Sequence, residues 1–89
     1  MTIKRGKNNV VYVDTTEEEM VVIAEIVERK QHATIKQHGA KKGVLVDLYS
    51  ASAIMNVYNH LSPESQAKMR SVPIGLRADI AFRVLAHQR

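Results

Sequence analysis

Residues 48–63 contain no Asp, Glu, Lys or Arg, and this uncharged run constrains the fold more than any other feature of the chain. On a helical wheel its apolar side chains cover an arc of about 220°, against roughly 100° for an ordinary surface helix. They are Leu48, Ala51, Ala53, Ile54, Met55, Val57, Tyr58 and Leu61. A helix of this kind is buried on more than one side. The sequence therefore predicts a central helix over about residues 47–61.

A long first helix is predicted between a capping box and a glycine. The capping box is formed by Thr15 with Glu18 or by Thr16 with Glu19, and the acidic first turn complements the helix dipole. Gly39 is a natural end for this helix. The basic residues that precede the glycine would then occupy the last turns.

The N-terminal residues have the pattern of a β-hairpin. Residues 10–13 are a β-branched and aromatic run that is short enough for a strand. Residues 3–5 can pair with this run across a turn that contains glycine and asparagine. Residues 1–9 are therefore either part of a hairpin or a flexible basic arm.

Two more helices follow the central one. Ser62 as N-cap before Pro63 begins a short helix, and a last helix is predicted over about residues 75–88. The predicted fold is mainly α. It is a single small domain of residues 1–89, in which a short N-terminal strand or β-hairpin precedes three to four helices.

The order strand, helix, helix over residues 3–61 is similar to that of ribbon-helix-helix DNA-binding dimers, whose paired strands enter the major groove. The connection of residues 31–43 is longer and more charged than the tight turn of that family. In size and composition the chain also resembles the small accessory proteins of bacteriophages and mobile elements, which implies a regulatory role.

Three of the predicted helices have apolar arcs that are wider than a surface helix needs. One small domain has too few elements to cover them, so the sequence predicts a homo-oligomer. The residues expected in the oligomer interface or the core are Ile54, Val57, Tyr58, Leu61, Ile80, Phe82 and Val84. The alternative is a compact monomer, in which the hairpin and the short helix cover these surfaces.

Charge is sorted into blocks along the chain. Residues 1–13 carry three cations and no carboxylate, residues 14–28 six carboxylates and no cation, and residues 29–46 five cations and no carboxylate. With a formal net charge of +4, the basic blocks favour a phosphate-bearing partner, and nucleic acid is the first choice. The candidate binding residues are Lys4, Arg5, Lys7, Arg29, Lys36, Lys41 and Lys42. A solvated tail and a helix C-terminus that complements its dipole explain the same residues without a ligand.

No residue pattern predicts catalysis, a metal or a cofactor. The four histidines form no H-x-x-x-H pair and cysteine is absent, so no metal site is expected. No nucleophile has an evident acid–base partner, and we expect a protein that is not an enzyme. No apolar run approaches the roughly 20 residues of a membrane span, and the start of the chain lacks the apolar stretch of a secretory signal. We therefore expect a cytoplasmic protein without a membrane partner.

The leading hypothesis is a non-enzymatic, self-associating protein that holds nucleic acid or another phosphate-bearing partner with its basic segments. The alternatives are a protein-binding adaptor or inhibitor and an oligomer that sequesters a small nucleotide-like ligand. Steep salt dependence of binding would favour the nucleic-acid hypothesis. Capture of one protein in the presence of nuclease would favour the adaptor, and thermal stabilisation by nucleotides would favour the oligomer that sequesters a small ligand.

Overall fold

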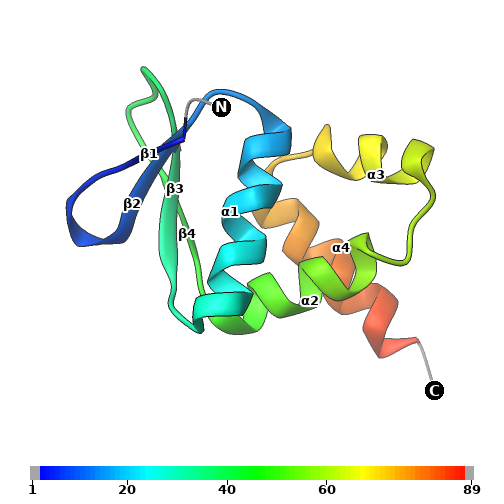
Figure 1. The fold of residues 1–89 in the computed structure, drawn as a ribbon. Helices are drawn as coiled ribbons and strands as arrows, with labels where there is room; N and C mark the ends of the chain where they lie inside the picture. The colour runs from blue at the N-terminus through cyan, green and yellow to red at the C-terminus, as the bar shows by residue number, and fades with distance from the viewer. Residues whose placement is uncertain (1–2, 88–89) are drawn as a thin grey trace.

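The computed structural model describes residues 3–87, in which four strands form one sheet and the helices pack on one of its faces (Figure 1). The strands are β1 (Lys4–Arg5), β2 (Val10–Val13), β3 (Ala33–Gln37) and β4 (Val44–Val46). The helices are α1 (Thr16–Arg29), α2 (Leu48–Tyr58), α3 (Pro63–Arg70) and α4 (Ile74–Ala86), and a 3₁₀ turn, η1 (Lys7–Asn9), joins β1 to β2.

The sheet has the strand order β1-β2-β3-β4. β1 pairs with β2 and β3 pairs with β4 in antiparallel hairpins, whereas β2 and β3 are parallel. A parallel pair needs a long crossover, and α1 provides it. The β2–α1–β3 unit therefore places α1 against one face of the sheet, and α2 and α4 pack beyond it (Figure 1).

The core lies between the sheet and the helices. Its most deeply buried apolar side chains are Val13, Val22, Ile23, Ala51, Ile54 and Ala81. They come from one strand and from α1, α2 and α4. Alternate strand residues point toward α1, so the other side chains of the strands point away from the core.

The expected mainly α class is wrong, because residues 33–37 and 44–46 are strands of a mixed four-stranded sheet. The first helix ends at Arg29, ten residues before the predicted glycine. Lys30 adopts left-handed backbone angles (φ 56°, ψ 41°), and its N–H donates to the carbonyl oxygen of Ile26. This backbone conformation stops the helix and turns the chain back toward the sheet.

The arrangement of ribbon-helix-helix dimers is also absent. β2 pairs with β1 and β3 of the same chain, so it is an inner strand of the sheet. The β3–β4 hairpin separates α1 from α2, and the two helices are therefore not joined by the tight turn of that family.

Local capping explains where three of the helices begin. Thr15 Oγ1 accepts a hydrogen bond from the N–H of Glu18 at 3.1 Å, and the Glu18 carboxylate accepts in return from the N–H of Thr15. The side chains of Asp47 and Ser62 accept from backbone N–H groups three residues ahead and so cap α2 and α3. Each cap satisfies a backbone donor that the helix itself leaves unpaired.

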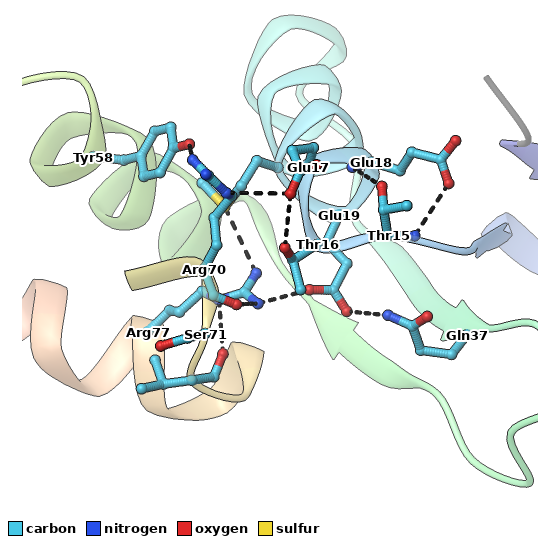
Figure 2. A network of polar contacts seen from close by, with 12 residues as sticks. Thr15, Thr16, Glu17, Glu18, Glu19, Gln37, Tyr58, Arg70, Ser71 and Arg77 are labelled. Carbon is cyan, nitrogen blue, oxygen red and sulfur yellow. Dashed lines mark hydrogen bonds and ion pairs between the residues drawn. The ribbon is translucent and has the colours of Figure 1, made fainter. Parts of the chain in front are cut away.

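A buried ion pair fastens α4 to α1 (Figure 2). Arg77 is 1 % exposed, and its Nη2 lies 2.7 Å from Glu19 Oε1. Arg77 also donates to the carbonyl oxygens of Arg70 and Val72, at 2.7 and 2.9 Å. The second oxygen of Glu19 accepts from Gln37 Nε2 of β3 at 2.6 Å. The pair therefore connects α1, β3, α4 and the turn before α4, with hydrogen bonds to both charges.

A neighbouring contact at the surface extends this network (Figure 2). Arg70 Nε lies 3.4 Å from Glu17 Oε1, and Arg70 Nη1 donates to the hydroxyl oxygen of Tyr58 at 2.6 Å. The acidic first turn of α1 thus meets arginines of α3 and α4 of its own chain.

Candidate functional site

One face of the sheet is not covered by any helix of residues 3–87 (Figure 1). The strand register identifies the residues on this open face. Tyr12 of β2 lies between Lys4 of β1 and Lys36 of β3, so the three side chains form one row across the sheet. A second row contains Val10, Thr34 and Leu45, and Leu45 is 66 % exposed.

The ring of Tyr12 is the centre of a cluster on this face. The ring of His38 stacks on it, with 5.8 Å between the centroids and 25° between the planes. Lys36 Nζ lies 5.9 Å from the centroid of the same ring, within the range of a cation–π contact. His38 Nε2 also lies 3.8 Å from Asp14 Oδ1, a contact that becomes an ion pair when His38 is protonated. We call Lys4, Tyr12, Lys36 and His38 the Tyr12 cluster.

The charge blocks of the sequence correspond to the two layers of the structure. The basic blocks, residues 1–13 and 29–46, include all four strands and both hairpin turns. The acidic block, residues 14–28, is α1 without its last residue, Arg29, together with the two residues before the helix. The segregation along the chain therefore becomes a segregation in space between the sheet and the helix behind it.

The predicted cationic residues lie in different parts of this layer. Lys7 is exposed in η1, and Lys41 and Lys42 are exposed in the β3–β4 turn. Because β2 and β3 are parallel, these two turns lie at opposite ends of the sheet. Lys4 and Lys36 lie between the two ends, on the open face.

Two predicted cations lie away from the open face. Arg5 points to the α1 side, where its Nη2 is 2.5 Å from Glu25 Oε1. Arg29 is the last residue of α1, and it lines a pocket together with His32. The structure thus places four cations on the open face and its β3–β4 turn, namely Lys4, Lys36, Lys41 and Lys42, and their role in binding stays a prediction.

Gly39 and Gly43 serve the β3–β4 hairpin, whose turn carries the candidate binding residues Lys41 and Lys42. Gly39 has a φ of 82°, a left-handed conformation that suits the turn. A Cβ on Gly43 would lie 2.6 Å from Thr34 Cγ2 and 3.2 Å from the carbonyl oxygen of Ile35. Gly43 is therefore needed where the chain passes close to β3.

A pocket of about 200 Å³ opens between the β1–β2 turn and the end of α1. Its floor is apolar and includes Val11, Val22 and Ile26. Its rim is polar and includes Asn9 and Gln31, whose side-chain amides are 3.4 Å apart in a hydrogen bond.

The residues expected in an interface or the core fall into three groups. Ile54 and Val57 are buried in the core of the single chain. Tyr58, Leu61 and Phe82 are partly buried against that core. Ile80 and Val84 are each 37 % exposed on α4.

A hydrogen bond from the backbone N–H of Ser50, joined by one from its side chain, holds the pKa of Asp47 below its usual value. The Ser50 N–H lies 2.7 Å from Asp47 Oδ1. Asp47 therefore keeps its charge at the start of α2, where the helix dipole favours an anion.

Sequence reasoning did not assign Tyr12 to a site, nor Glu19 and Arg77 to a buried pair. The alternation of apolar and polar residues in 33–37 was the available signal for the open face, because it predicts a strand with two different faces. Glu19 and Arg77 are 58 residues apart, and no local pattern connects them.

Within the described part of the chain, no three His, Cys, Asp or Glu side chains gather closely enough to hold a metal ion. Over the same residues, no helix combines the length and apolar character needed to cross a membrane. Comparison of the chain with known protein families, with curated proteins and with solved structures found no match.

Proposed function

We propose that the protein binds nucleic acid on the open face of its sheet. The supporting observation is that the four strands and their two hairpin turns carry cations and no carboxylate. Ammonium groups on such a face neutralise phosphates and release condensed counterions, and this effect supplies most of the affinity of non-specific nucleic-acid binding.

The position of the acidic residues supports the same proposal. The carboxylates of α1 belong to the helix that packs on the opposite face of the sheet (Figure 1). Glu25 is paired with Arg5, while Glu17 and Glu19 are paired with arginines of α3 and α4. The polyanion would therefore approach a positive surface with the carboxylates of α1 behind the sheet, and the one carboxylate described beside the Tyr12 cluster is Asp14, 3.8 Å from His38.

The proposal is tested by the salt dependence of binding to a labelled oligonucleotide. We expect Lys36→Glu and Lys4→Glu each to weaken binding about tenfold at low salt, and to reduce the slope of log K against log salt by about one for each lost phosphate contact. Lys68→Glu is the matched control, since Lys68 lies on α3 with its side chain 78 % exposed. Absence of binding at low salt would end the proposal.

We also propose that the protein acts in the cytoplasm and without catalysis or a cofactor. The chain contains no cysteine and so forms no disulfide, which fits a reducing compartment. If the protein instead binds no oligonucleotide at low salt and captures a single protein partner in the presence of nuclease, the adaptor alternative is favoured.

Self-association is proposed through α4. Leu76, Ile80 and Val84 are 48 %, 37 % and 37 % exposed and form an apolar stripe with one residue per turn. The stripe is symmetric about Ile80. An antiparallel pair of α4 helices would therefore place Leu76 against the partner's Val84 and Ile80 against the partner's Ile80.

The charges beside this stripe are complementary in the same arrangement. Asp79 and Arg83 form an ion pair of 3.1 Å on one flank of the stripe, and both side chains are more than half exposed. With a rise of 1.5 Å per residue, the antiparallel pair brings Arg83 to within about 3 Å, along the helix axis, of the partner's Asp79. Three side chains bury less than the roughly 1,200 Å² of a stable interface, so we expect a weak dimer.

Mixing two charge variants tests this dimer by sedimentation velocity. Asp79→Lys and Arg83→Glu should each be monomeric, because like charges then face one another across the pair. An equimolar mixture should associate again, although the ion pair within each helix remains broken. A wild-type protein that stays monomeric at about 1 mM, or a mixture no more associated than its components, would contradict the dimer.

A further inference from the structure

We infer that the nucleic acid is single-stranded, with one base stacked on the rings of Tyr12 and His38. This inference rests on the proposed function and names the ligand of the same open face. Single-stranded nucleic acid is typically bound by a positive groove or surface together with aromatic rings on which bases stack. The Tyr12 cluster combines both elements in one place.

The two rings are held in position before any ligand binds. Tyr12 belongs to β2, an inner strand of the sheet, and His38 is the residue directly after β3. The N–H of His38 donates to the carbonyl oxygen of Val13 at 3.0 Å, which ties the residue to the end of β2. A ring pair that is already ordered loses little conformational entropy when a base stacks on it.

The two lysines lie on either side of Tyr12. Lys4 and Lys36 are the cross-strand neighbours of Tyr12 on β1 and β3. Adjacent strands are about 4.8 Å apart, so the backbones of the two lysines are separated by about 10 Å across the sheet. Long, flexible side chains at this separation can reach the phosphates on either side of one stacked nucleotide.

A duplex could use only part of this arrangement. Its bases are stacked on one another, so its accessible backbone would meet the lysines but leave the rings without a base. An open strand presents phosphates and base faces together. The position of Tyr12 between two lysines therefore favours a single strand over a duplex of the same length.

Substitutions of Tyr12 separate stacking from phosphate binding. We propose fluorescence anisotropy with a labelled oligothymidylate of 12 nucleotides and with a duplex of equal length, both at low salt. Tyr12→Ala and Tyr12→Leu should weaken binding of the single strand about 5- to 100-fold and change duplex binding less than about twofold. Tyr12→Phe keeps the ring and should bind the single strand within about twofold of wild type.

Tyr49→Ala is the matched control for the loss of a tyrosine. Tyr49 is 75 % exposed on α2, and its ring stacks on Phe82, away from the sheet. Tyr49→Ala should leave the affinities for the single strand and for the duplex unchanged. Far-UV circular dichroism confirms that each variant is folded before its affinity is compared.

The outcomes distinguish this inference from the proposed function. If Tyr12→Ala and Tyr12→Leu bind the single strand as wild type does, while Lys36→Glu weakens binding, the stacked base is refuted and phosphate binding by the sheet stands. If wild-type protein binds neither oligonucleotide at low salt, the proposed function itself is refuted.

Discussion

Replacement of Arg77 by methionine is expected to be among the most destabilising single changes in this chain. Arg77→Met fills much of the space but leaves Glu19, which is 7 % exposed, with hydrogen bonding from Gln37 as its remaining partner. It also removes the donors to the carbonyl oxygens of Arg70 and Val72. Breaking a buried ion pair by removing one partner costs about 3–5 kcal/mol. A chain of this length has a stability of about 4–13 kcal/mol, so the loss is large.

Removal of both Glu19 and Arg77 should lower the free energy of unfolding less than removal of Arg77 alone. In Glu19→Met/Arg77→Met no carboxylate is left buried without its cation, and apolar replacement of a buried pair is often close to neutral. Arg77→Lys keeps the charge but loses the planar guanidinium group, so its free energy of unfolding should lie between those of wild type and Arg77→Met. It also provides a folded variant to measure if Arg77→Met does not fold.

Urea unfolding followed by far-UV circular dichroism measures these differences. Lys68→Met is the control, because its ion pair with Glu64 is exposed and 3.9 Å long, and its loss should change the free energy of unfolding by about 0.5 kcal/mol or less. A free energy of unfolding for Arg77→Met that lies within about 1 kcal/mol of the wild-type value would refute the reasoning. So would a double variant whose loss equals the sum of the two single losses.

Three further predictions concern the hairpin and the helix caps. Gly43→Ala should lower the free energy of unfolding by about 1–3 kcal/mol, because the new Cβ would lie 2.6 Å from Thr34 Cγ2; Gly75→Ala, where no described atom lies within 4 Å of the new Cβ, should not destabilise the fold in the same thermal melt. Thr15→Ala should lower the free energy of unfolding, measured with urea, by about 1 kcal/mol, because it removes the cap of α1. Thr15→Ser keeps a hydroxyl at this position and should retain most of the wild-type stability. The pKa of Asp47 is lower in the folded state than in the unfolded chain, so the stabilisation by its charged form is present above pH 3.8 and is lost as the pH falls through the folded pKa. Asp47→Asn should therefore weaken the loss of stability at acidic pH. A pH series of thermal melts in which this acidic loss is the same as in wild type would contradict the prediction.

The starts of helices could be predicted from the sequence because caps depend on neighbouring residues. The threonine and glutamate of the α1 capping box are three residues apart, and the caps of α2 and α3 act over the same distance. Interactions this local form in the same way whatever the rest of the chain does.

The end of α1 could not be predicted in the same way. Ala33 lies seven residues after Ile26 and so continues the apolar stripe of a helix, but it also begins the alternation of a strand. The residue that ends the helix, Lys30, carries no sequence signal for a left-handed conformation, which glycine usually provides. Pairing with β2 and β4 decides between the two structures, and that pairing involves residues far away in the sequence.

The candidate site was predicted in part. The basic blocks indicated a cationic surface, and the lysines in question lie on the sheet or its turns. The prediction that residues 33–37 are helical placed Lys36 at a helix terminus. The position of Lys36 beside Tyr12 across two neighbouring strands was therefore not expected. Once β3 is recognised as a strand, the parallel register with β2 brings the two residues together.

The two outer strands of the sheet differ in how they resist pairing with other molecules. β1 is two residues long and consists of Lys4 and Arg5, so charge protects this edge. β4 has the sequence Val-Leu-Val, and Val44 and Leu45 are 40 % and 66 % exposed. Its protection is its length of three residues and the lysines and aspartate on its two sides. Longer apolar versions of this strand would invite fibre-like stacking between molecules, and its shortness limits the length over which such stacking can form.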